Sequence, residues 1–417
     1  MKYSNDKLKP SFRLKYTKVL CLKSIFFLLV ASCSFGQPID NDYSAVDPIK
    51  TIEKANVVGA QKLDGILSLL DNKSVGVVGN QSSLVDGIHL VDTLLHSGIK
   101  VKRIFSPEHG FRGDADAGEH ISSQTDKKTG LSIVSLYGKN KKPHPSQQIG
   151  LDVLIFDIQD VGVRFYTYIS TLHYVMEACA ENHITLIILD RPNPNGHYID
   201  GPILDPTYKS FVGMHPIPIV HGMTIAEYAR MINGEKWLKN KIQCDLTVVS
   251  CDNYSHSRNY SLPVPPSPNL RSDISIQLYP SLCLLESTTV TLGRGTSSPF
   301  ECYGHPDFLK TEFAFIPRSG PGSKKPKHQD KLCNGFYLNN SNYERMYKLD
   351  LSFMLNAKKQ LNGKLFVDRS KFFNLLAGNN ILLQQVESGM SEDEIRATWK
   401  EGLDEFSLVR AKYLMYD

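Results

Sequence analysis

Carboxylates and amides follow four short apolar runs of this 417-residue sequence, each at the point where a run ends. Carboxylates can donate and accept protons, so several of them gathered in one place could carry out acid–base chemistry. The runs and the residues that follow them are 75–79 with Asn80, 101–105 with Glu108, 152–156 with Asp157, and 184–189 with Asp190.

The runs themselves predict the elements that position these residues. Short β-branched runs separated by amphipathic stretches are typical of parallel strands with crossover helices, in an α/β fold whose sheet is covered on both faces. The loops that follow such strands meet at one edge of the sheet, where ligands bind. The four polar clusters should therefore converge on one crevice, which is the pattern of an enzyme.

Glu108 is the strongest single candidate for a catalytic group. It lies between Pro107 and Gly110, and His109 and Arg112 are close to it in sequence. Proline and glycine fix a sharp backbone path, which suits a side chain that must be aimed at a substrate. The alternative is a surface carboxylate in a solvated turn.

Two further clusters suit the recognition of a sugar, because aromatic rings can stack on it while polar groups bind its hydroxyls. In each, the alternative is a salt-bridged loop that anchors a helix. The first cluster contains Asp157, Gln159, Asp160, Arg164, Tyr166 and Tyr168, and the second contains Asp190 and Asn193.

The second half of the chain supplies an opposing set of polar groups. Glu286 is followed by Arg294 and Thr296, which lie in a glycine-rich turn. A carboxylate and a guanidinium on opposed loops could close over the crevice. Glu301 competes with Glu286 for the same role, and Asn269 would point an amide into the cleft.

Several function classes have little support in the sequence. The net charge is only +4, and the basic residues 324–327 are interpreted as solvated surface, so no nucleic-acid partner is expected. There is no Walker loop, no glycine fingerprint after the first run and no two-histidine zinc motif, so we expect no cofactor. A metal hydrolase assembled from distant loops stays open as an alternative.

The N-terminus predicts export from a bacterial cytoplasm. Basic residues precede an apolar core over residues 20–30, and residues 30–33 (VASC) resemble a lipoprotein box. Residues 1–36 are therefore interpreted as an export signal and 37–55 as a tether, in a periplasmic protein or an outer-membrane lipoprotein attached through Cys33. The alternative is ordinary cleavage near Gly36. The six later cysteines lack metal spacing and are expected to be buried thiols.

The remaining chain should divide near the proline-rich residues 263–268, where the strand and helix pattern fails. Residues 56–262 would form the catalytic domain and 263–417 an auxiliary α+β domain. We expect three helices in particular. One covers 169–180, one begins at a capping box of Thr224 and Glu227, and the last begins at Ser391.

Seven motifs of the chain resemble the bacterial exo-β-N-acetylmuramidase family, and the similarity extends from about Gly59 to the C-terminus. One of these motifs contains His221, which is a further candidate for substrate binding. They are residues 106–113 (SPEHGFRG), 156–162 (FDIQDVG), 164–168 (RFYTY), 189–194 (LDRPNP), 221–224 (HGMT), 266–269 (PSPN) and 293–296 (GRGT).

The resemblance implies a Rossmann-like N-terminal domain, an auxiliary C-terminal domain and a cleft between them. It also implies release of terminal N-acetylmuramic acid from the non-reducing end of peptidoglycan fragments, with Glu108 as the catalytic acid. Three departures from the family pattern are Gln81 in place of a proline, residues 287–289 (STT) in place of Gly-Thr-Asn, and an apparent insertion over 324–331.

Glycoside hydrolysis needs an acid and usually a second carboxylate. We expect Glu108 to be the acid, assisted by His109, and Glu286 to be its partner, with Asp160 and Asp190 as alternatives. The lactyl carboxylate of muramic acid could be bound by Arg164, Arg294 or Arg112. Two other functions stay open: a cell-wall glycan-binding lipoprotein without turnover, and a peptidoglycan esterase or amidase. Retention or inversion and the oligomeric state are also left open.

Overall fold

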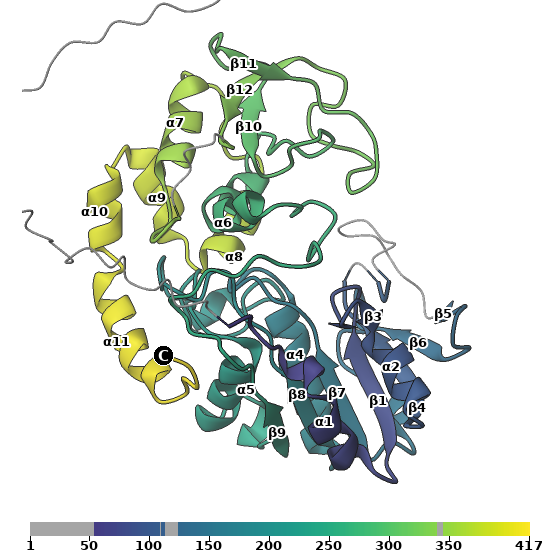
Figure 1. Cartoon of the computed structure of the whole chain (residues 1–417). Coiled ribbons are helices and arrows are strands. Elements are labelled where there is room, and N and C mark those ends of the chain that lie inside the picture. Colours follow the sequence, from purple (N-terminus) through teal and green to yellow (C-terminus); the bar gives the residue numbers. More distant parts are fainter. Residues whose placement is uncertain (1–53, 109, 113–123, 340–344) are drawn as a thin grey trace, which may run out of the picture. The chain divides into compact units, whose positions relative to one another are not determined.

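The structure is a computed structural model that describes residues 54–108, 110–112, 124–339 and 345–417 (Figure 1). Its largest element is a sheet of seven strands in the order β5-β6-β4-β1-β7-β8-β9. Every pairing is parallel except that of β5 with β6. The strands are β1 (Ser74–Gly79), β4 (Lys100–Ser106), β5 (Gln124–Thr125), β6 (Ser132–Ser135), β7 (Val153–Asp157), β8 (Thr185–Leu189) and β9 (Leu246–Val249).

The order of the six parallel strands confirms a Rossmann-like arrangement. From β1 the chain adds β4 and β6 on one side and then β7, β8 and β9 on the other, so the direction of winding reverses between β1 and β7. Ligands bind at such a switch point, beyond the carboxyl ends of the strands. The four predicted runs are therefore adjacent strands, and Asn80, Glu108, Asp157 and Asp190 follow them at one edge.

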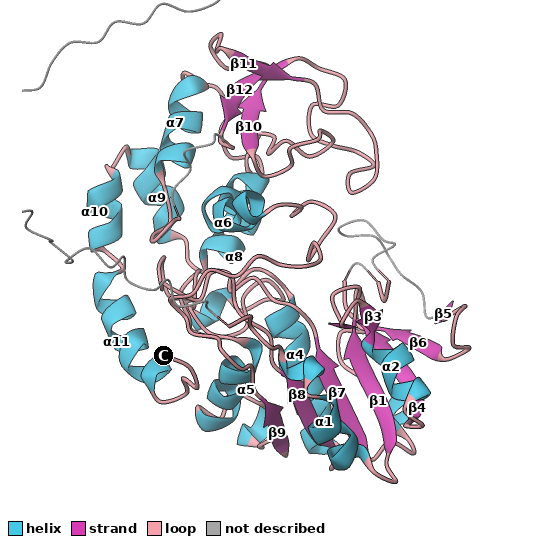
Figure 2. Ribbon diagram, viewed as in Figure 1, coloured by secondary structure: helices cyan, strands magenta, loops and turns pink. Residues whose placement is uncertain are grey.

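Helices cover both faces of this sheet (Figure 2). Alternate side chains of a strand point to opposite faces, so Val75 and Val77 pack with α1 and α2 while Val78 joins the core on the other side with α4 and α5. These helices are α1 (Leu63–Leu70), α2 (Leu90–His96), α4 (Tyr168–Glu181) and α5 (Ile225–Gly234). Short elements between them are η1 (Gly59–Gln61), β2 (Leu84–Val85), β3 (Ile88–His89), α3 (Pro145–Gln148), η2 (Pro206–Tyr208) and η3 (Lys239–Lys241).

Two of the helix predictions are confirmed in detail. Helix α4 crosses from β7 to β8, within a residue or two of the expected bounds. At the start of α5, Thr224 Oγ1 accepts from Glu227 N at 3.3 Å, and Glu227 Oε2 accepts from Thr224 N at 2.8 Å. This reciprocal capping satisfies two amides that the first helical turn would otherwise leave unpaired.

The C-terminal part is smaller and mixes helices with an antiparallel sheet of order β10-β12-β11. Its strands are β10 (Cys302–His305), β11 (Phe313–Phe315) and β12 (Cys333–Tyr337). Its helices are α6 (Asp273–Leu282), η4 (Cys283–Ser287), α7 (Ser352–Gln360), α8 (Ser370–Ala377), α9 (Ile381–Ser388), α10 (Glu392–Ala397) and α11 (Lys400–Ala411).

The prediction of one unbroken last helix is wrong. Ser391 and Glu394 form the expected capping box, but α10 ends at Ala397 and α11 begins at Lys400. Thr398 Oγ1 donates to the Ile395 carbonyl at 2.7 Å, which is the kind of local side-chain bond that competes with helix continuation.

A single hydrophobic core joins the α4 and α5 face of the sheet to the C-terminal helices, including Phe373, Trp399 and Phe406. Residues 54–417 accordingly form one compact unit, and the expected boundary near residue 263 stays a prediction. The six cysteines from Cys179 to Cys333 are buried, as expected. Among the described residues, no helix is both long enough and apolar enough to cross a bilayer.

Candidate active site

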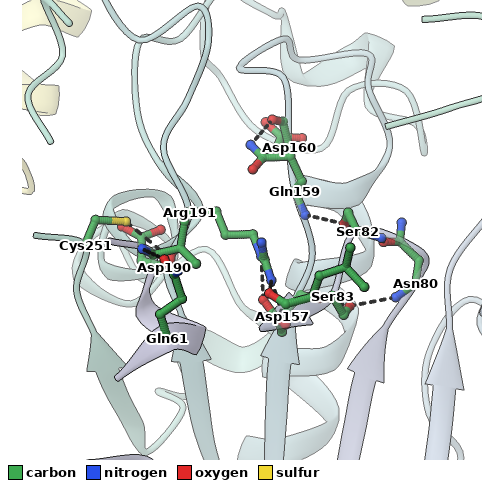
Figure 3. A network of polar contacts seen from close by, with 12 residues as sticks. Gln61, Asn80, Ser82, Ser83, Asp157, Gln159, Asp160, Asp190, Arg191 and Cys251 are labelled. Atoms are coloured by element: carbon green, nitrogen blue, oxygen red, sulfur yellow. Dashed lines mark hydrogen bonds and ion pairs between the residues drawn. The ribbon is translucent and has the colours of Figure 1, made fainter. Parts of the chain in front are cut away.

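The carboxyl ends of β1, β7 and β8 carry a buried polar network rather than an open crevice (Figure 3). Asn80 Oδ1 accepts from the Ser82 amide at 2.9 Å and from its hydroxyl at 2.6 Å, and Asn80 Nδ2 donates to the Tyr168 hydroxyl at 2.9 Å. Both polar atoms of the Asn80 side-chain amide thus bond within the protein. Asn80 therefore stabilises the loops at the switch point through contacts inside the protein.

Asp157 is held in the same way. Its two carboxylate oxygens accept from Arg191 Nε at 2.6 Å and Nη2 at 3.0 Å, and Asp157 has no exposed surface. The Ser83 hydroxyl, from the loop after β1, donates to the Asp157 carbonyl at 2.5 Å. The alternative of a salt-bridged anchoring loop describes Asp157 better than a role in contacting a ligand.

A second buried layer contains Gln159, Asp160, Asn193 and His221, none of them more than 4 % exposed. Gln159 Nε2 donates to the Pro192 carbonyl at 2.7 Å, and Asn193 Nδ2 donates to the Met223 carbonyl at 2.9 Å. Asp160 Oδ2 accepts from the Gly162 amide at 2.7 Å and lies 3.7 Å from His221 Nε2. These side chains link the loops after β7 and β8.

Asp190 lies at the end of β8 and is also buried. It accepts from the Tyr416 hydroxyl at 2.7 Å and from the Ala226 amide at 3.0 Å. Burial raises the pKa of this carboxyl to about 6, against the opposing effect of both hydrogen bonds. Asp190 thus ties the C-terminal segment to the sheet and does not line a cavity that Glu108 lines.

Glu108 and Glu286 line the same two cavities, although Glu108 follows β4 and Glu286 lies in η4. One, the aromatic cavity, has a volume of about 280 Å³ and the other, the basic cavity, about 720 Å³. The aromatic cavity is also lined by Tyr166, Tyr168, Tyr279, Arg294, Phe300 and Phe372. The basic cavity is also lined by Arg294, Lys324, Lys325, Lys327, Arg369 and Phe372.

Glu108 is half-buried and held by hydroxyl groups. The Thr167 hydroxyl, at the start of α4, donates to Glu108 Oε2 at 3.1 Å. Burial, the charge of Glu108 and a hydrogen bond to it raise the pKa of the Tyr137 phenol, which keeps this group a donor. Thr167 and Tyr137 therefore orient Glu108 toward the cavities. Sequence reasoning missed both, because each is an ordinary loop residue until the fold brings it to Glu108.

Glu286 and Arg294, which were expected to close over the crevice from opposed loops, instead bind each other. Arg294 Nε lies 2.7 Å from Glu286 Oε1, and the guanidinium stacks on the Phe300 ring at 4.9 Å from its centroid. Burial lowers the pKa of Arg294 and the Glu286 carboxylate raises it, with a net upward shift. The ion pair fixes the Glu286 carboxylate in the wall that the two cavities share.

The tyrosines at 166 and 168 fit a sugar-binding surface in part. Both line the aromatic cavity, and both hydroxyls donate to the Pro266 carbonyl, at 2.9 and 3.2 Å. Only parts of the rings face the cavity, since Tyr166 is 7 % and Tyr168 1 % exposed. They join the loop around the proline-rich segment to α4.

The structure places Arg164 and Arg112 outside both cavities, which removes them as ligands of a lactyl carboxylate there. Arg164 is fully buried, and its guanidinium donates to the carbonyls of Pro202, Ile217, Leu376 and Ala377. Arg112 binds Asp126 at 2.9 Å and Asp92 at 3.4 Å. Sequence alone cannot show that an arginine is consumed by distant carbonyls.

Three other candidates bond within the protein, Thr296 inside its own turn and Asn269 and Glu301 to distant segments. Thr296 Oγ1 donates to the Gly293 carbonyl at 2.6 Å, and Asn269 Nδ2 donates to the Gly322 carbonyl at 2.7 Å. Glu301 is buried and accepts from Asn339 Nδ2 at 2.8 Å and from the Ser272 hydroxyl. His109 lies outside the described residues, so its predicted role is unaltered.

The interpretation of residues 324–327 as solvated surface is wrong for Lys327. This side chain is partly buried, lines the basic cavity and donates to the Glu286 carbonyl at 2.9 Å and to the Thr288 carbonyl. Arg369 also lines the cavity and donates to the Glu286 carbonyl. Among the described residues, no group of three His, Cys, Asp or Glu side chains could hold a metal ion.

Two carboxylates that face shared cavities with aromatic and basic walls are the groups that a glycoside hydrolase uses. Comparison with known proteins agrees. Residues 75–274 match the model of the exo-beta-N-acetylmuramidase NamZ N-terminal region, and residues 277–416 match that of its C-terminal region. The chain therefore belongs to the exo-β-N-acetylmuramidase NamZ family.

Individual relatives match over nearly their whole length. A peptidoglycan beta-N-acetylmuramidase NamZ of Bacillus subtilis (strain 168) is 38% identical, with 94% of this chain and 100% of the relative covered. Two crystal structures of DUF1343 family proteins from Bacteroides fragilis NCTC 9343 are 45% and 26% identical, with TM-scores of 0.80 and 0.73. Each covers 87% of this chain and is itself covered to 99%.

Proposed function

We propose that this protein is an exo-β-N-acetylmuramidase, which hydrolyses terminal N-acetylmuramic acid from the non-reducing end of peptidoglycan fragments. The observation that carries the proposal is that Glu108 and Glu286 line the same aromatic cavity in a member of the NamZ family. The name of the Bacillus subtilis relative supports the same substrate class.

The geometry suggests distinct roles for the two carboxyl groups. Glu108, held by hydroxyl donors, would protonate the glycosidic oxygen as the bond to the leaving sugar breaks. Glu286, paired with Arg294, would remain a carboxylate that either activates water or stabilises the positive charge that develops on the sugar ring. The aromatic walls offer apolar surface to the ring face.

The size of the aromatic cavity favours exo action. Its volume of about 280 Å³ is near the lower limit of ligand pockets, which are roughly 300–1,000 Å³. One sugar residue suits such a space better than an internal stretch of glycan. The larger basic cavity shares Glu108 and Glu286 with it, so the lactyl substituent of the bound muramic acid and the rest of the substrate can extend into it across the carboxylates.

The test is turnover of a chromogenic β-N-acetylmuramide by purified protein, compared with Glu108→Gln. Gln keeps the size of the side chain but cannot supply the proton, so on a muramide whose chromogenic alcohol is a poor leaving group we expect kcat to fall by about 10²–10⁴-fold. Glu301→Gln is a matched control, because this buried carboxylate does not line either cavity. Hydrolysis by Glu108→Gln at the wild-type rate would refute the catalytic assignment.

The same assay separates the alternatives. A binding protein without turnover would retain the glycan and release no chromophore. An esterase or amidase would release acetate or peptide from the polymer while leaving the chromogenic muramide intact.

We also propose that residues 1–36 direct export and that Cys33 is lipidated, which would place the enzyme in the periplasm or at the outer membrane. The support is the basic and apolar pattern and the VASC sequence, since these residues lie outside those described. Labelling of cells with a radioactive fatty acid should mark the protein and should fail in Cys33→Ala. Label-free protein processed near Gly36 would show ordinary cleavage instead.

A further inference from the structure

The basic cavity has an excess of positive charge beside the two carboxylates. Its described lining contains only Glu108 and Glu286 as acidic residues. The basic residues of the lining are Arg294, Lys324, Lys325, Lys327 and Arg369. Arg294 is already paired with Glu286, and among the described residues Glu108 alone is left in this lining to face Lys325, Lys327 and Arg369.

Lys327 is the most informative of these cations because it is buried in part without an ionic partner. Nζ donates to the carbonyls of Glu286 and Thr288, and among the described residues Asp368 and Glu286 act on its charge without forming an ion pair with it. Burial lowers the pKa of this ammonium group to about 8. A partly buried ammonium group of this kind is stabilised when an anion binds beside it.

Arg369 reaches the same place from the segment before α8. Its Nη2 donates to the Glu286 carbonyl, its amide donates to the Ser287 carbonyl at 3.2 Å, and its guanidinium stacks on Phe372 at 5.1 Å from the ring centroid. Its ion pair with Asp368 is long, at 3.9 Å, and half exposed. Two cations from distant segments therefore converge on the main chain of Glu286.

We propose that Lys327 and Arg369 form a subsite that binds a carboxylate of the substrate beside the catalytic pair. This inference rests on the proposed function, because muramic acid differs from glucosamine by an acidic lactyl group. The same chemistry could come from the lactyl carboxylate itself or from the carboxylates of a stem peptide attached to it. Arg164 and Arg112 cannot bind this carboxylate, because Arg164 donates to main-chain carbonyls and Arg112 pairs with Asp126.

The test measures binding, so that it does not depend on turnover. Calorimetry would compare N-acetylmuramic acid with its neutral lactyl amide, and a muramoyl dipeptide with its amidated form. We expect the wild type to bind at least one acid about tenfold more tightly than its neutral form, as for a charge-assisted hydrogen bond. In Lys327→Met and Arg369→Gln this preference should shrink, with the affinity for the neutral form unchanged.

Two variants control for indirect effects. Lys331→Met removes an exposed lysine of the same loop that does not line the cavity, and should keep the preference. Lys327→Arg retains a cation and should restore most of it. A preference seen only with the dipeptide identifies the peptide carboxylate as the ligand and supports the subsite.

Equal losses for acid and neutral ligands in Lys327→Met would show that the lysine only supports the loop, and would overturn the subsite. If the wild type shows no preference for either acid, the subsite is likewise overturned. Cleavage of the chromogenic muramide would then still support the proposed hydrolase. Conversely, a preference without cleavage would refute the hydrolase and retain the subsite.

Discussion

Arg294 Nε lies 2.7 Å from Glu286 Oε1, and this contact joins a glycine-rich turn to the end of η4. Gly293 and Gly295 both have positive φ, of 70° and 81°. A Cβ on Gly293 would lie 2.5 Å from the Ser298 carbonyl oxygen and 2.6 Å from Cys302 Sγ, so a larger residue cannot fit without displacing the turn. The turn thus fixes the arginine before any substrate binds.

Loss of this arginine should therefore disable Glu286 without abolishing the fold. For Arg294→Met we expect kcat on the chromogenic muramide to fall by about 10–100-fold, because a carboxylate loses its charged partner. A double-mutant cycle with Glu286→Gln measures the coupling. Additive effects of the two changes would show that the ion pair has no part in the reaction.

Thr167 provides a subtler test of how Glu108 is aimed. Thr167→Val removes the hydroxyl that donates to Glu108 Oε2 while keeping the shape of the side chain. We expect kcat to drop by about tenfold, in line with one lost hydrogen bond to a charged group, and Thr167→Ser to remain near wild type. Steady-state kinetics of the three proteins would decide, and an unchanged kcat in Thr167→Val would exclude an orienting role.

The affinity for N-acetylmuramic acid should depend on pH through Lys327, whose pKa is lowered to about 8 mainly by burial. The lysine loses its charge as the pH rises through that value, so the dissociation constant should increase between pH 7 and 9. Asp368 and Glu286 oppose this loss of charge, whereas Arg369 and Arg294 favour it. Lys327→Arg should bind with no such change, since arginine stays charged.

Asp190 should make the folded state less stable as the pH rises. Burial raises its pKa from 3.8 to about 6, so between these values the native protein keeps a proton that the unfolded chain has lost. The free energy of unfolding should therefore fall by on the order of 3 kcal/mol between pH 4 and 7 from this group. Urea titrations of wild type and Asp190→Asn should differ in this slope, and identical slopes would contradict the assignment.

Arg164 should be essential for stability and not for catalysis. Arg164→Met leaves the carbonyls of Pro202, Ile217, Leu376 and Ala377 without their donor, which should cost about 3–5 kcal/mol. Arg318→Met, at an exposed position with a 3.3 Å ion pair to Asp330, should change stability by less than about 1 kcal/mol. Denaturant midpoints and m-values provide the comparison.

Much of the sheet could be predicted from sequence, because apolar β-branched runs and capping boxes are local signals. The runs before Asn80 and Asp157 are buried on both faces of a parallel sheet, and this shows directly in their composition. Glu286 and Arg294 were also chosen correctly as cavity residues, but their pairing with each other was not predicted. The break between α10 and α11 was not predicted, because the apolar residues keep helical spacing across it.

The site was harder to predict where tertiary contacts decide which polar groups face a cavity. Asp157 and Asp190 follow strands as Glu108 does, yet their carboxylates are consumed by Arg191 and Tyr416. Conversely, Lys327 belongs to a segment whose composition resembles solvated surface, and only its packing on the Glu286 main chain brings it to the cavity. Residue type and spacing do not encode such long-range partners.

The guanidinium of Arg164 also restricts how this protein could be recombined with its relatives. It donates to four carbonyls that come from two distant stretches, 202–217 and 376–377. Gly378 adds to this constraint, because a Cβ there would lie 2.6 Å from Arg164 Nη2. A chimaera that exchanges the C-terminal half alone must preserve this junction, so the two halves are expected to be inherited and engineered together.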